Sequence, residues 1–177
     1  DSARHMGVLL DGLTALSRVG LAPLEMVPVP LQELVQTVRA EVMAKYPLRA
    51  VEWQIADDLP TVLADATLLH QALTHVMGNA LKFTAPRALA KIDIRTVPGA
   101  LEGYVALQVR DNGVGYNLAQ QDRLFRVFGR LHSAKQFEGI GIGLVLTRKI
   151  LARMGGYVSA EAAVDAGCRV ELQLQRA

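Results

Sequence analysis

The sequence predicts an α+β protein in which a layer of helices covers one β-sheet, a two-layer α/β sandwich. Segments with the apolar spacing of helices alternate with short segments of the period-two spacing typical of strands. Neighbouring strand segments follow each other in the manner of antiparallel hairpins. The chain has 177 residues, of which 51% are hydrophobic. This is enough for one domain with a core and a short appendage.

The composition excludes several classes of protein. The net charge of +2 comes from 19 basic and 17 acidic residues without a basic block, so nucleic-acid binding is not expected. Cys168 is the one cysteine, which rules out an intrachain disulfide and favours a reducing compartment. No apolar run approaches the roughly 20 residues that cross a bilayer, and no signal peptide is visible. We therefore expect a soluble, cytoplasmic chain without a membrane segment.

Residues 1–20 are expected to form a helix that precedes the main domain. Apolar residues recur there with spacings of three, four and three, as in helices that pair with another helix. These residues are Met6, Leu9, Leu13 and Leu16. The helix either packs on its own domain or is the end of a dimerising helix whose partners lie outside this chain. Residues 21–30 contain three prolines and are predicted to be a linker.

Residues 31–177 are predicted to form the main domain. One helix is expected over 31–45 and a longer one over 65–83, with Asp65 as its N-cap and Pro86 preventing continuation. A third helix is expected over 143–154, ended by two glycines. The predicted strands lie around 51–55, 92–94, 104–109, 157–161 and 168–174.

Two glycine-rich segments interrupt this plan. Residues 111–115, Asp-Asn-Gly-Val-Gly, follow a strand directly, and residues 139–143, Gly-Ile-Gly-Ile-Gly, open a helix. Glycines let the backbone approach a ligand closely, and a helix N-terminus favours phosphate. Tight turns also need glycine, so a purely structural interpretation of either segment stays open.

A polar stripe on the 65–83 helix supports the interpretation as a ligand site. His75, Asn79, Lys82 and Phe83 lie at i, i+4, i+7 and i+8 and therefore share one face. Asn79 offers an oxygen to a hard metal ion, and Lys82 offers a point charge to phosphate. The alternative is an ordinary exposed polar face.

The connection between the two glycine segments has the length and composition of a lid. Residues 116–138 are polar but contain Phe125 and Phe128, which would anchor the base of such a lid. Arg126 and Arg130 could reach a triphosphate. Arg126 is equally well explained as a surface charge.

Taken together, these segments resemble the four motifs of histidine kinases, in the same order and spacing. Residues 75–84 resemble the N box, 111–115 the G1 box, 124–132 the F box and 139–144 the G2 box. Arg130-Leu131-His132, followed by Phe137-Glu138-Gly139, is similar to the phytochrome-like group. The opening residues to Gly20 resemble the end of the second helix of the family's dimerisation domain.

The resemblance implies the Bergerat ATP-binding fold, with ATP and Mg²⁺ as ligands. It implies that Asp111 accepts a hydrogen bond from the adenine amino group, that Asn79 coordinates Mg²⁺ and that Lys82 contacts phosphate. Arg130 is the lid cation expected at the γ-phosphate, so Asn79, Lys82 and Arg130 are the expected catalytic residues. The full set expected to bind the nucleotide is His75, Asn79, Lys82, Asp111, Gly113, Gly115, Phe128, Gly139, Gly141, Gly143 and Leu144.

The same resemblance implies partners and exposes departures from the family pattern. It implies a homodimer in the full-length protein, a phosphoacceptor domain of the same kinase and a downstream response regulator. None of the four histidines is followed by an acidic residue, as the family's phosphorylated histidine is. We therefore expect transfer to a histidine outside this chain. His75 replaces the first asparagine of the N box and Ile140 the commoner threonine of the G2 box.

These departures leave two competing hypotheses. One is a nucleotide-binding module without useful catalysis, which His75 and Ile140 would explain. The other is an ATPase switch of the gyrase or Hsp90 kind. The F box and the short lid argue against the switch, as does His75 in the place of the glutamate that those ATPases carry.

Overall fold

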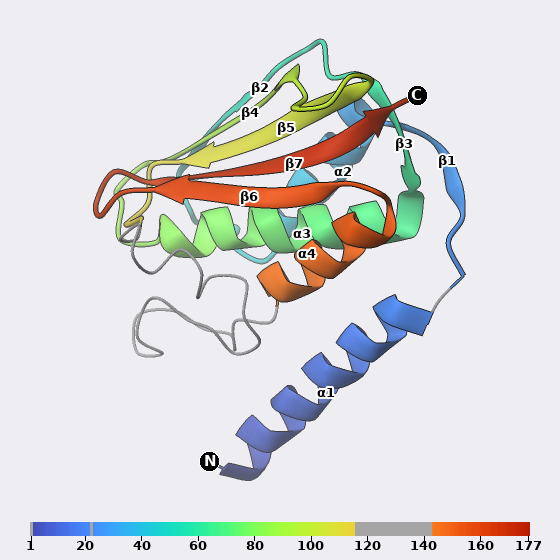
Figure 1. The fold of residues 1–177 in the computed structure, drawn as a ribbon. Coiled ribbons are helices and arrows are strands. Elements are labelled where there is room, and N and C mark those ends of the chain that lie inside the picture. The colour runs from blue at the N-terminus through green and yellow to red at the C-terminus, as the bar shows by residue number, and fades with distance from the viewer. Residues whose placement is uncertain (1, 22, 116–142) are drawn as a thin grey trace.

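The computed structural model describes residues 2–21, 23–115 and 143–177. Within these ranges the helices and the strands of one sheet follow each other along the chain as Figure 1 shows. The elements are α1 Ser2–Leu21, β1 Met26–Pro30, α2 Leu31–Ala44, β2 Val51–Ile55, β3 Thr61–Asp65, α3 Ala66–Phe83, β4 Ala90–Pro98, β5 Tyr104–Asp111, α4 Gly143–Arg153, β6 Tyr157–Ala162 and β7 Cys168–Arg176.

The described strands form a single sheet in the order β1-β3-β7-β5-β4-β2, with β6 paired to β7. β3 and β6 share one edge of β7, since β3 pairs only with its last residues and β6 with residues 168–173. All pairs are antiparallel except β2 with β4, which run parallel. Two of these pairs, β4 with β5 and β6 with β7, join consecutive strands as the predicted hairpins. The other pairs join strands that are not consecutive in the chain.

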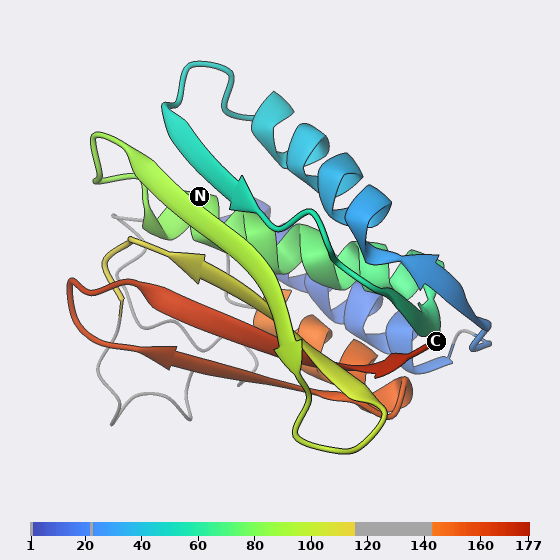
Figure 2. The same cartoon turned by 90° about the horizontal axis from the view of Figure 1, so that it is seen from above.

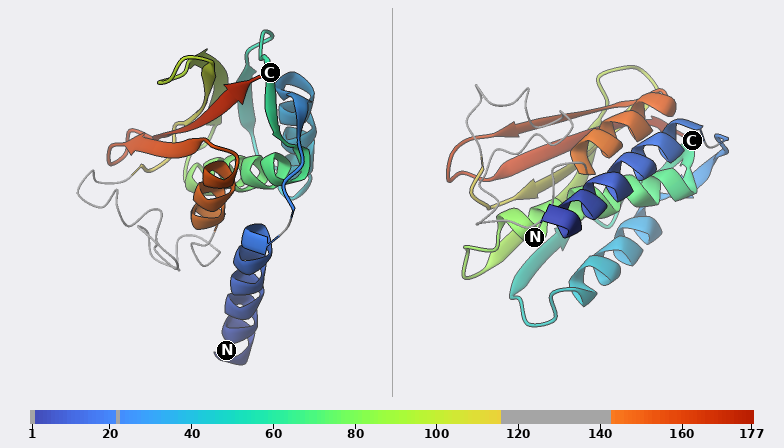
Figure 3. Two further views of the ribbon diagram at one scale, coloured as in Figure 1. Left: turned by 45° about the vertical axis from the view of Figure 1, so that its right-hand side comes forward. Right: turned by 90° about the horizontal axis from the view of Figure 1, so that it is seen from below.

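Helices α2, α3 and α4 cover one face of the sheet, while the other face carries no helix among the described residues (Figures 2 and 3). The core lies between the two layers, where α3 contributes the largest share of its buried residues. The fully buried large side chains are Leu31, Leu69, Leu73, Met77, Leu81, Ile92, Ile94, Leu107, Leu146, Ile150, Leu151 and Leu172. The predicted two-layer sandwich is confirmed.

Helix α3 has both ends fixed by side chains. The Asp65 carboxylate accepts a hydrogen bond from the Leu68 backbone N–H at 3.0 Å, which is the predicted N-cap. At the other end the Arg49 guanidinium donates to the Leu81 carbonyl and, at 3.1 Å, to the Thr84 hydroxyl. These contacts satisfy groups that a helix end leaves without intrahelical partners. The side chains near the end of α3 are therefore held in a defined place.

The structure corrects the predicted linker. Residues 26–30 form β1, an edge strand paired with β3, and Val29 is buried. Pro28 and Pro30 are tolerated because one side of an edge strand needs no N–H donors. Strand β3 itself was not predicted, since its five residues follow directly after a proline turn and lead straight into a long helix.

Helix α1 confirms the expected N-terminal helix, and its two ends have different surroundings. Near the C-terminal end Val19 is buried, and Arg153 of α4 donates to the Val19 carbonyl at 2.7 Å. Further toward the N-terminus Met6, Leu10 and Leu13 are exposed, and α1 extends away from the sheet and helices (Figures 1 and 3). No described helix has the length and apolar character to cross a bilayer.

Candidate functional site

The carboxylate of Asp111 lies at the end of β5, between β4 and β7, and is only 7% exposed. Its Oδ1 accepts a hydrogen bond from the Gly113 backbone N–H at 2.8 Å, and the backbone N–H of Cys168 also donates to it. Burial raises the pKa of Asp111 to about 6, and these two hydrogen bonds oppose the rise. At neutral pH the group is therefore a buried carboxylate that can accept a further hydrogen bond from a ligand.

Gly113 and Gly115, predicted to allow close approach of a nucleotide, are crowded by the protein's own backbone. A Cβ at position 113 would lie 2.5 Å from the Phe83 carbonyl oxygen. At position 115 it would lie 1.9 Å from the Ala163 carbonyl oxygen, and Gly115 has a φ of 62°. The described contacts thus explain both glycines structurally, whether or not a ligand approaches them.

A third glycine at this site was not singled out from the sequence. Gly167 has a φ of 84°, and a Cβ there would lie 2.0 Å from the carbonyl oxygen of Asp111. It lies in the turn between β6 and β7, which brings this turn against the end of β5. An Ala-Gly pair between two predicted strands is the only signal of it in the sequence, and a turn explains that signal equally well.

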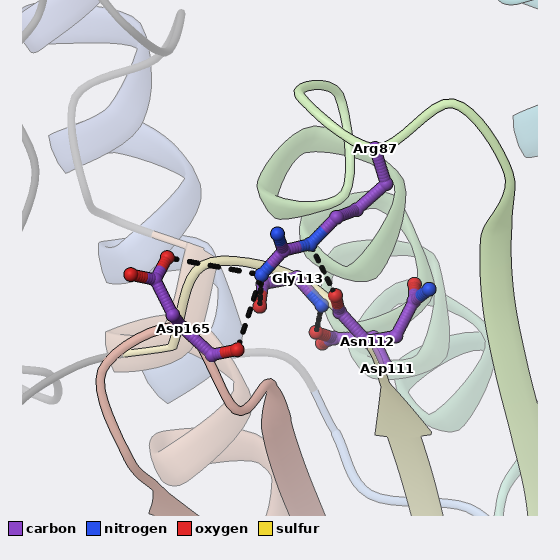
Figure 4. A network of polar contacts seen from close by, with 5 residues as sticks. All are labelled: Arg87, Asp111, Asn112, Gly113 and Asp165. Atoms are coloured by element: carbon purple, nitrogen blue, oxygen red, sulfur yellow. Dashed lines mark hydrogen bonds and ion pairs between the residues drawn. The ribbon is translucent and has the colours of Figure 1, made fainter.

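Arg87 was also missed, although it links three parts of the site (Figure 4). Its Nε donates to the Asn112 carbonyl at 2.8 Å, and one terminal nitrogen donates to the carbonyls of Gly113 at 3.0 Å and Asp165 at 3.2 Å. The Asn112 side chain meanwhile accepts from the Lys91 N–H and donates to the Leu89 carbonyl. An arginine in a loop carries no sequence pattern that would predict such contacts.

The predicted polar stripe on α3 is confirmed as one half-buried face. His75, Asn79, Lys82 and Phe83 are all of intermediate exposure, whereas the helix buries its other side in the core. The pKa of His75 is lowered, first by burial and then by the nearby charges of Lys82 and Lys45. His75 is therefore neutral at physiological pH. The Asn79 side chain forms no hydrogen bond with another described residue.

The end of α3 and the 111–115 segment are joined directly. The Val114 backbone N–H donates to the Phe83 carbonyl at 3.2 Å, and the Asp165 N–H donates to the Val114 carbonyl at 2.7 Å. The structure therefore brings together two of the four predicted motifs, which are separated by about thirty residues in the sequence.

The other two motifs fall mainly outside the described residues. Phe128, Arg130, Gly139 and Gly141 belong to residues 116–142, so their predicted roles are not tested by the structure. Gly143 is the first residue of α4, as predicted for a helix opened by the second glycine segment. Leu144 is buried in the core, and α4 packs beside α3.

The donor set of the site suits Mg²⁺ held through a nucleotide. Within the described ranges, no group of three or more His, Cys, Asp and Glu side chains could hold a metal ion. Mg²⁺ in phosphate sites usually binds one or two protein oxygens together with phosphate oxygens and water. One half-buried amide, Asn79, with Lys82 one helical turn further on, fits that arrangement.

Comparison with known proteins identifies the family. Residues 64–177, more than half of the chain, match the family described as histidine kinase-, DNA gyrase B- and HSP90-like ATPases. The chain belongs to this family, and it corresponds to the ATP-binding domain of sensor histidine kinases.

Individual relatives agree with this assignment. Cyanobacterial phytochrome B of Nostoc sp. is 29% identical over 97% of this chain, and the kinase BarA of Escherichia coli is 30% identical over 89%. The chain spans only 23% and 18% of these two proteins. Among solved structures, full-length ShkA in complex with AMPPNP has a TM-score of 0.75 at 28% identity, covering 99% of this chain and 37% of ShkA. The mycobacterial kinase MprB, at 23% identity and a TM-score of 0.72 over 85% of this chain and 98% of the MprB chain, shows the same fold.

Proposed function

We propose that this chain binds Mg²⁺ and ATP and donates the γ-phosphoryl group to a histidine on a separate segment of a two-component sensor kinase. The observation that carries the proposal is the buried Asp111 carboxylate held beside the polar stripe of α3, with Val114 bonded to Phe83 between them. This arrangement supports an assignment in which Asp111 accepts from adenine and the α3 stripe binds the phosphates, joined by one short backbone link. The nucleotide bound to ShkA, a structure of the same fold, supports the choice of ligand.

Each residue of the site has a role set by its chemistry. The Asp111 carboxylate accepts a hydrogen bond from the adenine amino group, while Gly113 and Gly115 let the backbone pass close to the nucleotide. Asn79 offers its amide oxygen to Mg²⁺, and Lys82 neutralises phosphate charge. Bound Mg²⁺ would withdraw charge from the phosphate oxygens. Phosphoryl transfer depends chiefly on positioning and charge neutralisation, which these groups supply.

Six further expected residues complete this assignment. His75 lies on the same half-buried stripe as Asn79 and lines the phosphate side as a neutral imidazole. Phe128 is proposed to anchor the base of the lid, and Arg130 is the lid cation proposed for the γ-phosphate. Gly139 and Gly141, together with Gly143, are proposed to line the phosphate site. These last five roles rest on the motif resemblance alone.

Helix α1 is proposed to be the end of a dimerisation helix. Its exposed Met6, Leu10 and Leu13 are apolar side chains that a second helix would cover, and Val19 and Arg153 fix the last turn to α4. On this basis we place residues 1–20 in the dimerisation and phosphoacceptor domain and residues 31–177 in the catalytic domain. The kinase is a cytoplasmic homodimer that phosphorylates a response regulator.

A transfer experiment tests the proposal. The chain is mixed with a separate segment of its own kinase that carries the dimerisation helices, together with Mg²⁺ and γ-labelled ATP. Acid-labile phosphohistidine on that segment is the expected result, and an Asp111→Asn variant serves as the inactive control. Nucleotide binding without transfer identifies a binding module instead. Phosphate release in the absence of the second segment identifies an ATPase.

A further inference from the structure

Arg87 lies four residues after the end of α3. The proposed phosphoryl transfer gives this residue no role. Its side chain is 33% exposed, so it is neither a core residue nor a free surface cation. Its hydrogen bonds all go to backbone carbonyls: those of Asn112, Gly113 and Asp165. From this geometry we propose that Arg87 is a positioning residue that sets the preference for adenine by orienting the Asp111 carboxylate through the following peptide. The inference rests on the proposed role of Asp111.

The connection from Arg87 to Asp111 passes through a single peptide plane. The carbonyl of Asn112 and the N–H of Gly113 belong to the same planar unit and point in opposite directions. Arg87 Nε binds the carbonyl at 2.8 Å, and the Gly113 N–H binds Asp111 Oδ1 at 2.8 Å. Fixing one side of the plane therefore fixes the direction of the other. The cation also polarises the unit and strengthens the N–H as a donor.

The second point of attachment prevents this plane from rotating. One terminal nitrogen of Arg87 donates to both Gly113 and Asp165, whose carbonyls come from β5's extension and the β6–β7 turn. The same turn holds Gly167 against the Asp111 carbonyl. Three carbonyl oxygens thus converge on one guanidinium, which offers five N–H donors in a planar fork. A lysine ammonium has the charge but cannot reproduce the planar fork that spans the two segments.

The ion pair with Asp165 does not explain why an arginine is present at position 87. The two charged groups are 3.8 Å apart, and the Asp165 side chain is 77% exposed, a setting in which salt bridges contribute little. What Asp165 supplies is its carbonyl and its unusual backbone, with a φ of 59°. Asparagine also tolerates this conformation. An Asp165→Asn variant therefore removes the charge and keeps the backbone.

The test compares ATP with purine riboside triphosphate, which lacks only the 6-amino group. Calorimetry with Mg²⁺ gives both dissociation constants for the wild-type chain, for Arg87→Met and for Arg87→Lys. We expect the wild-type chain to prefer ATP by about tenfold or more, as for one hydrogen bond to a charged group. In both variants the preference should fall to within about twofold, while affinity for purine riboside triphosphate changes by less than about threefold. The rate of transfer at saturating ATP should stay within about twofold of the wild-type rate.

The outcomes separate this inference from the proposed function. A wild-type chain without any preference for ATP refutes the adenine role of Asp111 itself. If the wild-type chain prefers ATP and folded Arg87 variants keep that preference, or lose affinity for both nucleotides equally, Arg87 is merely structural and the inference is wrong. Asp165→Asn and Arg95→Met, which alters an arginine bonded to Asp93 alone, should both retain the wild-type preference. Should Arg87→Met fail to fold, the conservative Arg87→Lys variant decides.

Discussion

The two sides of the proposed nucleotide site are built from different material. On the adenine side, the contacts that shape residues 111–115 are nearly all made to backbone groups, and glycines fill the places where a Cβ would collide. On the phosphate side, His75, Asn79 and Lys82 project as half-buried side chains from a regular helix. In the proposed site, the base therefore contacts a surface that forms only when the surrounding backbone is folded. The phosphates contact side chains that act through their charge and their ligand atoms. Changes on the first side should therefore alter folding and binding together, and changes on the second should alter chemistry alone.

The largest effect is expected from Gly167→Ala. A Cβ at this position has both an unfavourable φ of 84° and a contact of 2.0 Å with the Asp111 carbonyl. Chemical denaturation should show a loss of at least about 3 kcal/mol, with loss of ATP binding. Gly103→Ala is the matched control, since Gly103 has a φ of 80° but no atom within 4 Å of its Cβ position. It should cost only about 1–2 kcal/mol. Equal losses in the two variants would contradict the crowding argument.

Asp111→Asn should change stability and ATP binding together, but in opposite directions. The carboxyl has an ordinary pKa of 3.8, which the fold raises to about 6, so the folded state binds the proton more tightly than the unfolded state. The stabilising contribution of the protonated carboxyl group is therefore fully present below about pH 4 and is lost as the pH rises through 6. At pH 8 the ionised group costs up to about 3 kcal/mol.

We accordingly expect the Asp111→Asn variant to melt at a higher temperature than the wild-type chain at pH 8 and at the same temperature near pH 4. Its affinity for ATP at pH 8 should fall by about 100-fold. ATP affinity of the wild-type chain should itself fall as the pH is lowered from 7 to 5, because protonation removes the charge that strengthens the hydrogen bond to the base. If Asp111→Asn were instead less stable than the wild-type chain at pH 8, the hydrogen bonds to the buried carboxylate would outweigh the cost of burying its charge.

On the phosphate side, Asn79→Ala should change chemistry with little effect on folding. The side chain is half-buried and alanine is the better helix former, so the free energy of unfolding should change by less than about 1 kcal/mol. Phosphotransfer with Mg²⁺ should fall by about 100-fold, while affinity for adenosine, which has no phosphate, stays unchanged. Thr74→Ala, on the same helix with its hydroxyl bonded to the His70 carbonyl at 2.8 Å, is the control. If Asn79→Ala lost adenosine binding, Asn79 would belong to the adenine side of the site, and its assignment to the phosphate side would be wrong.

Arg49→Met tests how firmly the end of α3 is held. The variant removes the hydrogen bonds to the Leu81 carbonyl and the Thr84 hydroxyl but keeps an aliphatic side chain beside Tyr46. A loss of about 1–2 kcal/mol in denaturation is expected, since two hydrogen bonds from a charged donor are removed, while the Thr84 hydroxyl still donates to the Leu81 carbonyl. Arg95→Met, at an exposed arginine, should leave the free energy of unfolding essentially unchanged.

The smallest effect is expected at His75. Its pKa is lowered by burial and by Lys82 and Lys45, so the imidazole is neutral and contributes no charge to the phosphate side. His75→Ala should therefore transfer phosphate within about twofold of the wild-type rate, measured at pH 7.5 with saturating ATP. A large fall would instead assign His75 to the orientation of a water or a phosphate oxygen.

The sequence predicts the regular parts of this molecule well, because their patterns are local. The helix 65–83 and its Asp65 cap follow from apolar spacing and one N-cap residue, and the shared face of His75, Asn79 and Lys82 follows from helical geometry. Strands β1 and β3 escaped prediction, since short proline-flanked segments acquire strand character only through pairing with each other. The roles of Arg87 and Gly167 were not predicted for a related reason. Their roles arise where a loop after α3 meets a turn some eighty residues later, and no local pattern encodes that meeting.

The crowding at Gly113, Gly115 and Gly167 affects how other members of this family are interpreted. These glycines would be required by the fold even in a chain that had stopped using ATP, because carbonyls of the protein itself occupy the space around them. Their presence is thus poor evidence that a homologue is active. The buried acid at 111 is the opposite case, since burial opposes its ionisation and its proposed role is to bind adenine. A degenerate, pseudoenzyme descendant should replace this acid early and keep its glycines, so position 111 is the better diagnostic of retained activity.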